Sequence, residues 1–245
     1  MEVTLLNHTP LWIADKAIGK CWDKPTPDET HFVCSECSFE DFRNDYPCGG
    51  CDKENTLTSV SYIGCNIERI ERVANKNKHA STIEHLNYTF DIDGISRACL
   101  QELARHRMAS PSVKSTRYTL KELKNENPFT FEDADIMLDS MKRAEKYLVF
   151  TDETEVNIAS VKALENLRIM IVNGIANDKA KYCLPEAYKT SLVWTINARS
   201  LQNFLALRSS KAALWEIRDL ANIIYKALPE DHKFLFKDCI HESAN

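Results

Sequence analysis

The chain has 245 residues, a formal net charge of -5, and a composition that is 44% hydrophobic and 27% charged. Such a chain can bury one substantial core, and its acidic balance excludes the overall basic footprint of a nucleic-acid-binding domain. No apolar run approaches the ~20 residues that span a bilayer, and the start MEVTLLNHTP lacks the features of a secretion signal, so we expect a cytoplasmic protein.

The first elements are expected to be short. Residues 3–6 favour a strand, and residues 11–18 favour a helix that ends near Gly19. Residues 23–58 then carry nine acidic and three basic side chains, a balance of -6, which leaves the rest of the chain near +1. We interpret the chain as one domain over residues 1–245 with an acidic, Cys-rich insertion at residues 23–58.

The insertion contains two CxxC pairs, Cys34 with Cys37 and Cys48 with Cys51, separated by ten residues. Four thiolates at this spacing suit one tetrahedral ion, and the Gly-Gly inside the second pair permits a tight turn. A structural zinc site would stabilise a segment too polar to fold alone. The alternative is a loop with four reduced surface thiols.

After the insertion, apolar residues at helical spacing predict a helix over residues 67–77. His79, Ser81 and His85 follow on a turn. From Leu86 to Ile92 apolar and polar residues alternate, which is typical of a strand with one buried face.

A helix that begins at Gly94 or Ser96 is predicted to present Arg105 at its end, where the helix dipole favours a cation. Residues 105–118 read RHRMASPSVKSTRY, with four Arg and Lys residues and no acid. Arginine forks and hydroxyl groups match phosphate geometry, so this stretch predicts a site for a phosphorylated ligand. Pro111 predicts a loop and a short extended segment over residues 110–118.

Three further helices are predicted at residues 133–150, 152–174 and 177–184, and a fourth at residues 212–228. For the second, Asp152 and Glu155 form a capping-box-like start. Its expected apolar face contains Val156, Ala159, Ala163, Leu167 and Ile171. We interpret the first two helices as core or subunit interface and the fourth as a packing helix. The third carries Asp178 and Lys181, whose spacing suits a surface ion pair.

A second basic block lies between Thr195 and Lys211, again without an acid. Arg199 and Asn203 are four residues apart on one predicted helical face, so both can reach one ligand. Asn197 and Arg208 bracket that helix.

Three segments together resemble one known family. The pattern Arg105-His106-Arg107, seven residues, Ser115, one residue and Arg117 is similar to the signature of the flavin-dependent thymidylate synthases. WTINARSLQNFLALR, at residues 194–208, resembles that family's flavin and nucleotide segment, and HASTIEH, at residues 79–85, resembles the segment before its central strand.

The resemblance implies an α/β (α+β) fold, with a central, largely antiparallel sheet flanked by helices, and a homotetramer with shared active sites. It implies formation of dTMP from dUMP with methylene-tetrahydrofolate, FAD and NADPH. The implied flavin contacts are His79, Ser81, Arg105, His106, Arg107, Asn197, Arg199 and Asn203. The implied dUMP contacts are Gln101 or Glu102, Arg105, Ser115, Thr116, Arg117, Lys181 and Arg208.

Arg208 matches the arginine that stabilises the ionised uracil in this family and is the catalytic candidate. Three positions depart from the family pattern. Glu102 stands where a dUMP-binding glutamine is frequent, with Gln101 beside it, Lys181 replaces a frequent arginine, and Ala212 falls where some members have a histidine near the folate. Two other functions are weighed. One is a flavin reductase without methyl transfer, and the other is a zinc-knuckle interaction protein.

Overall fold

The computed structural model describes residues 1–22, 28–34, 40–41, 57–63 and 65–241, with side chains in the first and last of these ranges. The described chain forms two compact units, residues 1–8 with 87 onward and residues 9–86. Of the four proposed zinc ligands, Cys37, Cys48 and Cys51 lie outside the described residues, and Cys34 is described only as backbone.

The first unit is built on a four-stranded antiparallel sheet in the order β1-β5-β7-β6. Its strands are β1 (Glu2–His8), β5 (Asn87–Ser96), β6 (Ala109–Val113) and β7 (Lys189–Asn197). The alternation that predicts β5 is confirmed, because Tyr88, Phe90 and Ile92 are fully buried. Gly94 adopts φ +75° where the β5–β7 register shifts, a conformation that favours glycine.

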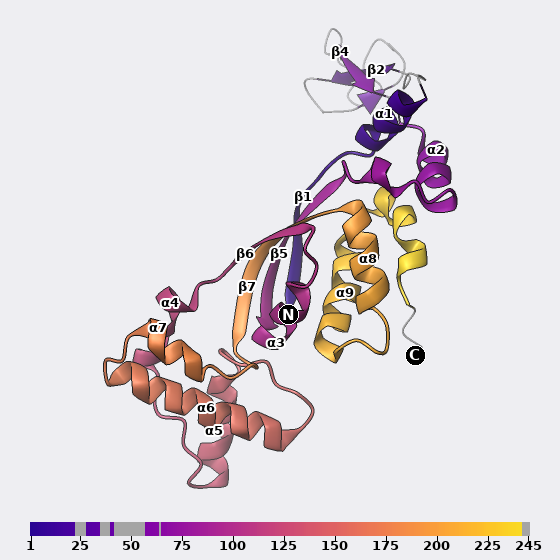
Figure 1. Ribbon diagram of the computed structural model, residues 1–245. Coiled ribbons are helices and arrows are strands. Elements are labelled where there is room, and N and C mark those ends of the chain that lie inside the picture. The colour runs from indigo at the N-terminus through magenta and orange to yellow at the C-terminus, as the bar shows by residue number, and fades with distance from the viewer. Residues whose placement is uncertain (23–27, 35–39, 42–56, 64, 242–245) are drawn as a thin grey trace. The chain divides into compact units, whose positions relative to one another are not determined.

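Helices cover the buried face of this sheet, as Figure 1 shows. They are α3 (Arg97–Leu103), α8 (Ala198–Arg208) and α9 (Trp215–Ala227). The ring of Trp194 on β7 packs against Phe204 on α8 at 5.1 Å, and both side chains are at most 1% exposed. Two 3-10 segments follow, Glu230–Leu235 and Lys237–Cys239.

Between β6 and β7 the chain forms a helical group with its own buried cluster. It contains α4 (Thr116–Thr119), α5 (Ala134–Ala144), α6 (Thr154–Val172) and α7 (Asn177–Ala180), with 3-10 segments at Leu120–Asn125 and Lys181–Cys183. Asp133 caps α5, since its Oδ1 accepts a hydrogen bond from Ile136 N at 2.8 Å.

Several predictions for this group were wrong in detail. The helix predicted over residues 133–150 ends at Ala144, because Leu148 forms a β-bridge with Tyr188. The predicted capping box is absent, since α6 begins at Thr154 without a side-chain cap. Instead Asn157 bonds both backbone groups of Thr151.

The predicted apolar face of α6 is correct only in its second half. Leu167 and Ile171 are buried, whereas Val156 is 50% exposed and Ala159 is also exposed. The buried face begins instead with Asn157, Val161 and Leu164. Residues 110–113, expected as loop or short extended chain, belong to strand β6 and pair with β7.

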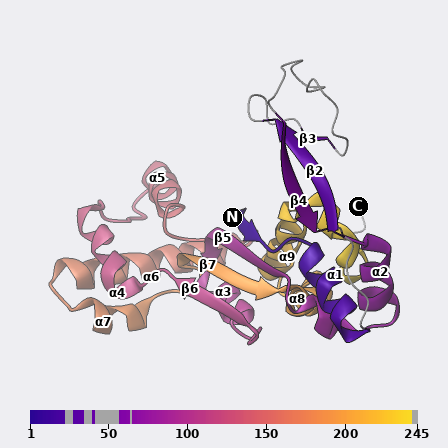
Figure 2. The same ribbon diagram turned by 90° about the horizontal axis from the view of Figure 1, so that it is seen from above.

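The second unit contains α1 (Trp12–Cys21), α2 (Ile67–Glu71), a π-helical turn at Arg72–Lys76 and a 3-10 segment at Ala80–Ile83. A small antiparallel sheet in the order β3-β2-β4 is visible in Figure 2, with β2 (Asp28–Cys34), β3 (Glu40–Asp41) and β4 (Leu57–Ile63). Asp15, which is fully buried, accepts a hydrogen bond from Arg69 Nε at 2.6 Å and ties α1 to α2.

The mixed fold with an antiparallel central sheet agrees with the predicted fold class. Among the helices in the described ranges, none combines the length and the apolar character that crossing a bilayer would require.

Candidate active site

The start of α3 is fixed by a buried polar network. Ser96 Oγ accepts a hydrogen bond from Cys99 N at 3.0 Å and so caps the helix. Glu216, in the first turn of α9, accepts hydrogen bonds from Ser96 N at 2.7 Å and from Ser96 Oγ. The carboxylate is 3% exposed and lies at the N-terminal ends of two helices, where the helix dipoles favour a negative charge.

The end of α3 carries the most densely bonded group of the site, which we call the arginine–histidine cluster: Glu102, Arg105, His106 and Arg208. Arg208 Nη1 donates to Glu102 Oε2 at 2.6 Å, and Arg208 Nε donates to His106 Nε2 at 3.0 Å. Arg208 Nη2 also donates to the backbone oxygen of Glu102 at 3.2 Å. The cluster therefore joins the end of α8 to the end of α3, 106 residues earlier in the chain.

His106 is neutral at physiological pH. Burial, and after it the positive charges of Arg208 and Arg105, lower the pKa of His106 to about 4 against a smaller opposing effect of Glu102. Because Arg208 Nε donates to His106 Nε2, the proton of the neutral ring lies on Nδ1. Phe204 supports the ring edge to face at 5.0 Å.

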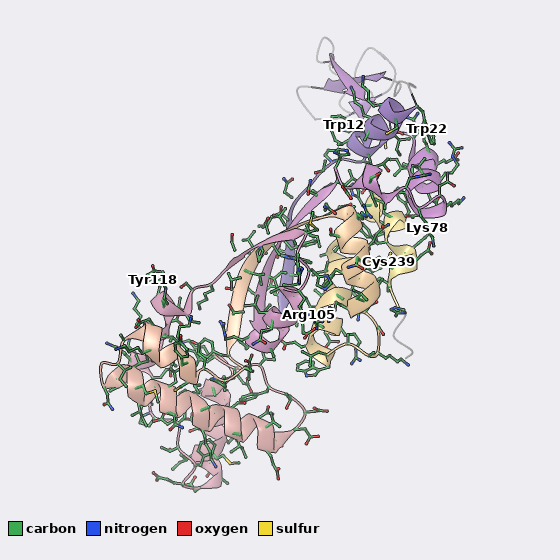
Figure 3. All side chains as sticks on the ribbon, in the orientation of Figure 1. Trp12, Trp22, Lys78, Arg105, Tyr118 and Cys239 are labelled. Carbon is green, nitrogen blue, oxygen red and sulfur yellow. The ribbon has the colours of Figure 1, made fainter. Side chains whose placement is uncertain are left out.

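Further polar side chains predicted for the site lie near Arg105 and along α8. The Arg105 side chain is 70% exposed and lies 3.3 Å from Glu102, and Figure 3 shows it beside α3. Arg107, Arg199 and Asn203 are exposed as well, the last two on the same side of α8, as predicted. Asn197 caps α8, because its Oδ1 accepts a hydrogen bond from Ser200 N at 2.8 Å.

The other half of the predicted anion site lies elsewhere. Ser115, Thr116, Arg117 and Lys181 form what we call the α4–α7 cluster. Asn177 Nδ2, at the start of α7, donates to the backbone oxygen of Arg117 at 2.7 Å. Strand β6 separates this cluster from Arg107, and five strand residues span about 17 Å. Figure 3 shows Tyr118 well away from Arg105.

Two sequence-predicted residues have other partners in the structure. Gln101 Nε2 donates to both carboxylate oxygens of Glu186, at 2.9 and 3.0 Å. Ser115 Oγ has no hydrogen-bond acceptor among the described residues, so no base there activates it as a nucleophile. The buried thiol of Cys99 is no nucleophile either, because burial raises its pKa.

In the second unit, Ser81 lines a cavity of about 490 Å³ together with Lys16, Lys20 and His85. A smaller cavity of about 130 Å³ is lined by His79 and Ser81. The lining of the larger cavity is mainly apolar, and Lys16, Lys20, Ser81 and His85 are among its polar residues.

Sequence reasoning missed two functional contacts. It did not predict the ion pair between Glu102 and Arg208, since residues so far apart in the chain give no local signal of contact. It also missed Glu216, although a lone acid among the apolar residues on the inner face of an amphipathic helix is a signal of a buried partner.

Comparison with known proteins decides the family. The family model described as "Thymidylate synthase complementing protein" matches residues 23–232. Flavin-dependent thymidylate synthases of Campylobacter jejuni and Wolinella succinogenes are each 54% identical over 242 residues, which is 99% of this chain and of each relative. The chain belongs to the flavin-dependent thymidylate synthase family. The resemblance in the three sequence segments is thereby confirmed.

A solved member of the flavin-dependent thymidylate synthase family has the same fold. The crystal structure of the Helicobacter pylori enzyme complexed with FAD and dUMP matches with a TM-score of 0.77 and 46% identity. The match covers 98% of this chain and 100% of the other.

Proposed function

We propose that this protein methylates dUMP to dTMP, with methylene-tetrahydrofolate as carbon donor and NADPH-reduced FAD as hydride source. The observation that carries the proposal is the arginine–histidine cluster, in which the RHR segment and the second basic block meet at Arg208. Family membership over nearly the whole chain supports the same activity.

The side chains around the cluster fit a flavin nucleotide. Exposed Arg105, Arg107 and Arg199 are suited to a diphosphate, and neutral His106 presents an Nδ1–H donor of the kind that a flavin carbonyl or ring nitrogen accepts. We propose that these residues hold FAD with Asn197 and Asn203. His79 and Ser81 remain flavin contacts that the sequence resemblance implies. Reduced FAD, when bound, supplies the hydride.

For dUMP we propose contacts from Gln101 or Glu102, from Arg105 and Arg208, and from the α4–α7 cluster. Strand β6 separates Arg107 from Ser115, so the two groups of proposed dUMP contacts lie apart in one chain. This separation supports active sites that are shared between subunits of a homotetramer, with Arg105 reaching the dUMP of a neighbouring subunit. We also infer a cytoplasmic location.

Arg208 is the proposed catalytic residue. Carbon 5 of uracil is a weak nucleophile until negative charge accumulates in the ring, and a guanidinium beside O2 and N3 stabilises that charge. Ser115, which lacks a base, is assigned to positioning.

The absorption spectrum of the purified protein, titrated with dUMP, tests the proposal. We expect a flavin spectrum that changes on dUMP addition, and dTMP formation that requires dUMP, NADPH and methylene-tetrahydrofolate together. Oxidation of NADPH without dTMP would indicate a flavin reductase. A flavin-free protein that is inert toward dUMP would contradict both activities.

Sharing of sites is tested by mixing inactive Arg208→Ala and Arg117→Ala proteins, because Arg208 belongs to the arginine–histidine cluster and Arg117 to the α4–α7 cluster. Mixed tetramers should regain part of the activity, and none regained would contradict a shared site.

For the Cys-rich insertion we keep the proposal of a structural zinc ion on Cys34, Cys37, Cys48 and Cys51. One zinc per chain is expected, and a metal-free protein would end this proposal.

A further inference from the structure

Arg208 is held on three of its five N–H groups. Nε donates to His106, Nη1 to the Glu102 carboxylate and Nη2 to the Glu102 backbone oxygen. Two N–H groups remain, one on each terminal nitrogen, and they can donate to the acceptors of a ligand.

The Glu102 carboxylate serves Arg208 more than Arg105. Its distance to Arg208 is 2.6 Å, against 3.3 Å to Arg105. The Arg208 side chain is 13% exposed, whereas that of Arg105 is 70% exposed and is screened by solvent. Glu102 therefore has one principal partner, and that partner is the proposed catalytic group.

We propose that Glu102 is a positioning residue that acts through Arg208 and does not itself recognise dUMP. Its carboxylate and backbone oxygen fix the guanidinium before the ligand arrives, and the fixed guanidinium in turn keeps the His106 proton on Nδ1. A carboxylate performs this task better than the glutamine frequent in the family, because a charged acceptor bonds arginine more strongly than an amide does. The inference rests on the proposed function of Arg208.

A double-mutant cycle tests whether Glu102 acts through Arg208. It compares the wild type, Glu102→Gln, Arg208→Lys and the double variant. The readouts are the dUMP dissociation constant, taken from the flavin absorbance change, and kcat and KM for dTMP formation. In the wild-type background Glu102→Gln should weaken dUMP binding about 5-fold and lower kcat about 10-fold or more, because a guanidinium that is not preorganised loses most in the transition state.

In the Arg208→Lys background the same change should alter each quantity less than about 2-fold, because the group through which Glu102 acts is gone. Equal factors in both backgrounds would overturn the inference, since they indicate that Glu102 contacts dUMP independently. Weaker dUMP binding with kcat unchanged would also overturn it. A purely structural role would reduce the amount of folded protein and leave the dissociation constant, KM and kcat per folded site unchanged.

Glu230→Gln is the matched control, because it removes a carboxylate that pairs with Lys233 at 2.6 Å outside the cluster. It should leave binding and kcat at wild-type values. A wild type that binds dUMP without forming dTMP contradicts the proposed function alone, and the binding cycle still decides the role of Glu102. A wild type that does not bind dUMP overturns both.

Discussion

Replacing Glu216 by Ala should strongly destabilise the first unit. The change leaves Ser96 N and Ser96 Oγ, both buried at the start of α3, without their acceptor. A hydrogen bond to a charged group contributes ~1.5–3 kcal/mol, so the loss of two predicts about 3–6 kcal/mol less free energy of unfolding. For a chain of this size, each kcal/mol lowers Tm by about 2–4 °C, which predicts a Tm lower by about 10 °C.

Urea unfolding followed by circular dichroism measures this loss. Glu216→Gln retains one carbonyl acceptor and should lose about half as much. Asp219→Ala, which removes an exposed acid from the same helix, should change stability by less than ~0.5 kcal/mol. A loss below ~1 kcal/mol for Glu216→Ala would refute the assignment of this carboxylate as the anchor of α3.

Three other outcomes are expected. Arg208→Lys should lower kcat for dTMP formation by about 10²–10³-fold, because a preorganised donor is lost. The control variant Arg218→Lys should keep a kcat near that of the wild type in the same assay, and equal rates for the two variants would exclude a catalytic Arg208. Phe204→Ala should cost ~3–5 kcal/mol in urea unfolding, because a buried ring that packs on Trp194 is lost; a cost below ~1 kcal/mol would contradict that packing. Burial lowers the pKa of His232 to about 4, so the unfolded chain binds more protons than the folded chain between pH ~6.5 and ~4. The free energy of unfolding should therefore fall as pH falls through this window, and His232→Gln should make this fall less steep. An unchanged dependence of stability on pH in the variant would contradict a neutral buried ring.

The local patterns of the sequence predicted most elements of the fold. Alternation located β5, and helical spacing located α3, α8 and α9. The central strand β7 was not predicted, although Thr190, Leu192, Trp194 and Ile196 alternate as buried residues along it. The early end of α5 could not be read locally, because a bridge to Tyr188 overrides the helical spacing of residues 145–150.

For the site, charge reversal identified the two basic segments, but not their geometry. The ion pairs of the site depend on the pairing of strand β5 with strand β7, in which Asn87 lies opposite Asn197. The sequence therefore predicted Arg208 as a site residue, whereas its bonds to Glu102 and His106 required the structure.

Because β7 lies between β5 and β6 in the sheet, the growing chain has unpaired strand edges during synthesis until β7 is translated. When β6 has been translated, more than 70 further residues must follow before β7 emerges, and until then β5 pairs on one side only and β6 has no partner strand. A nascent chain at this stage presents open strand edges that invite pairing with other chains. Truncation before residue 189 should thus yield a chain that depends on chaperones and aggregates without them.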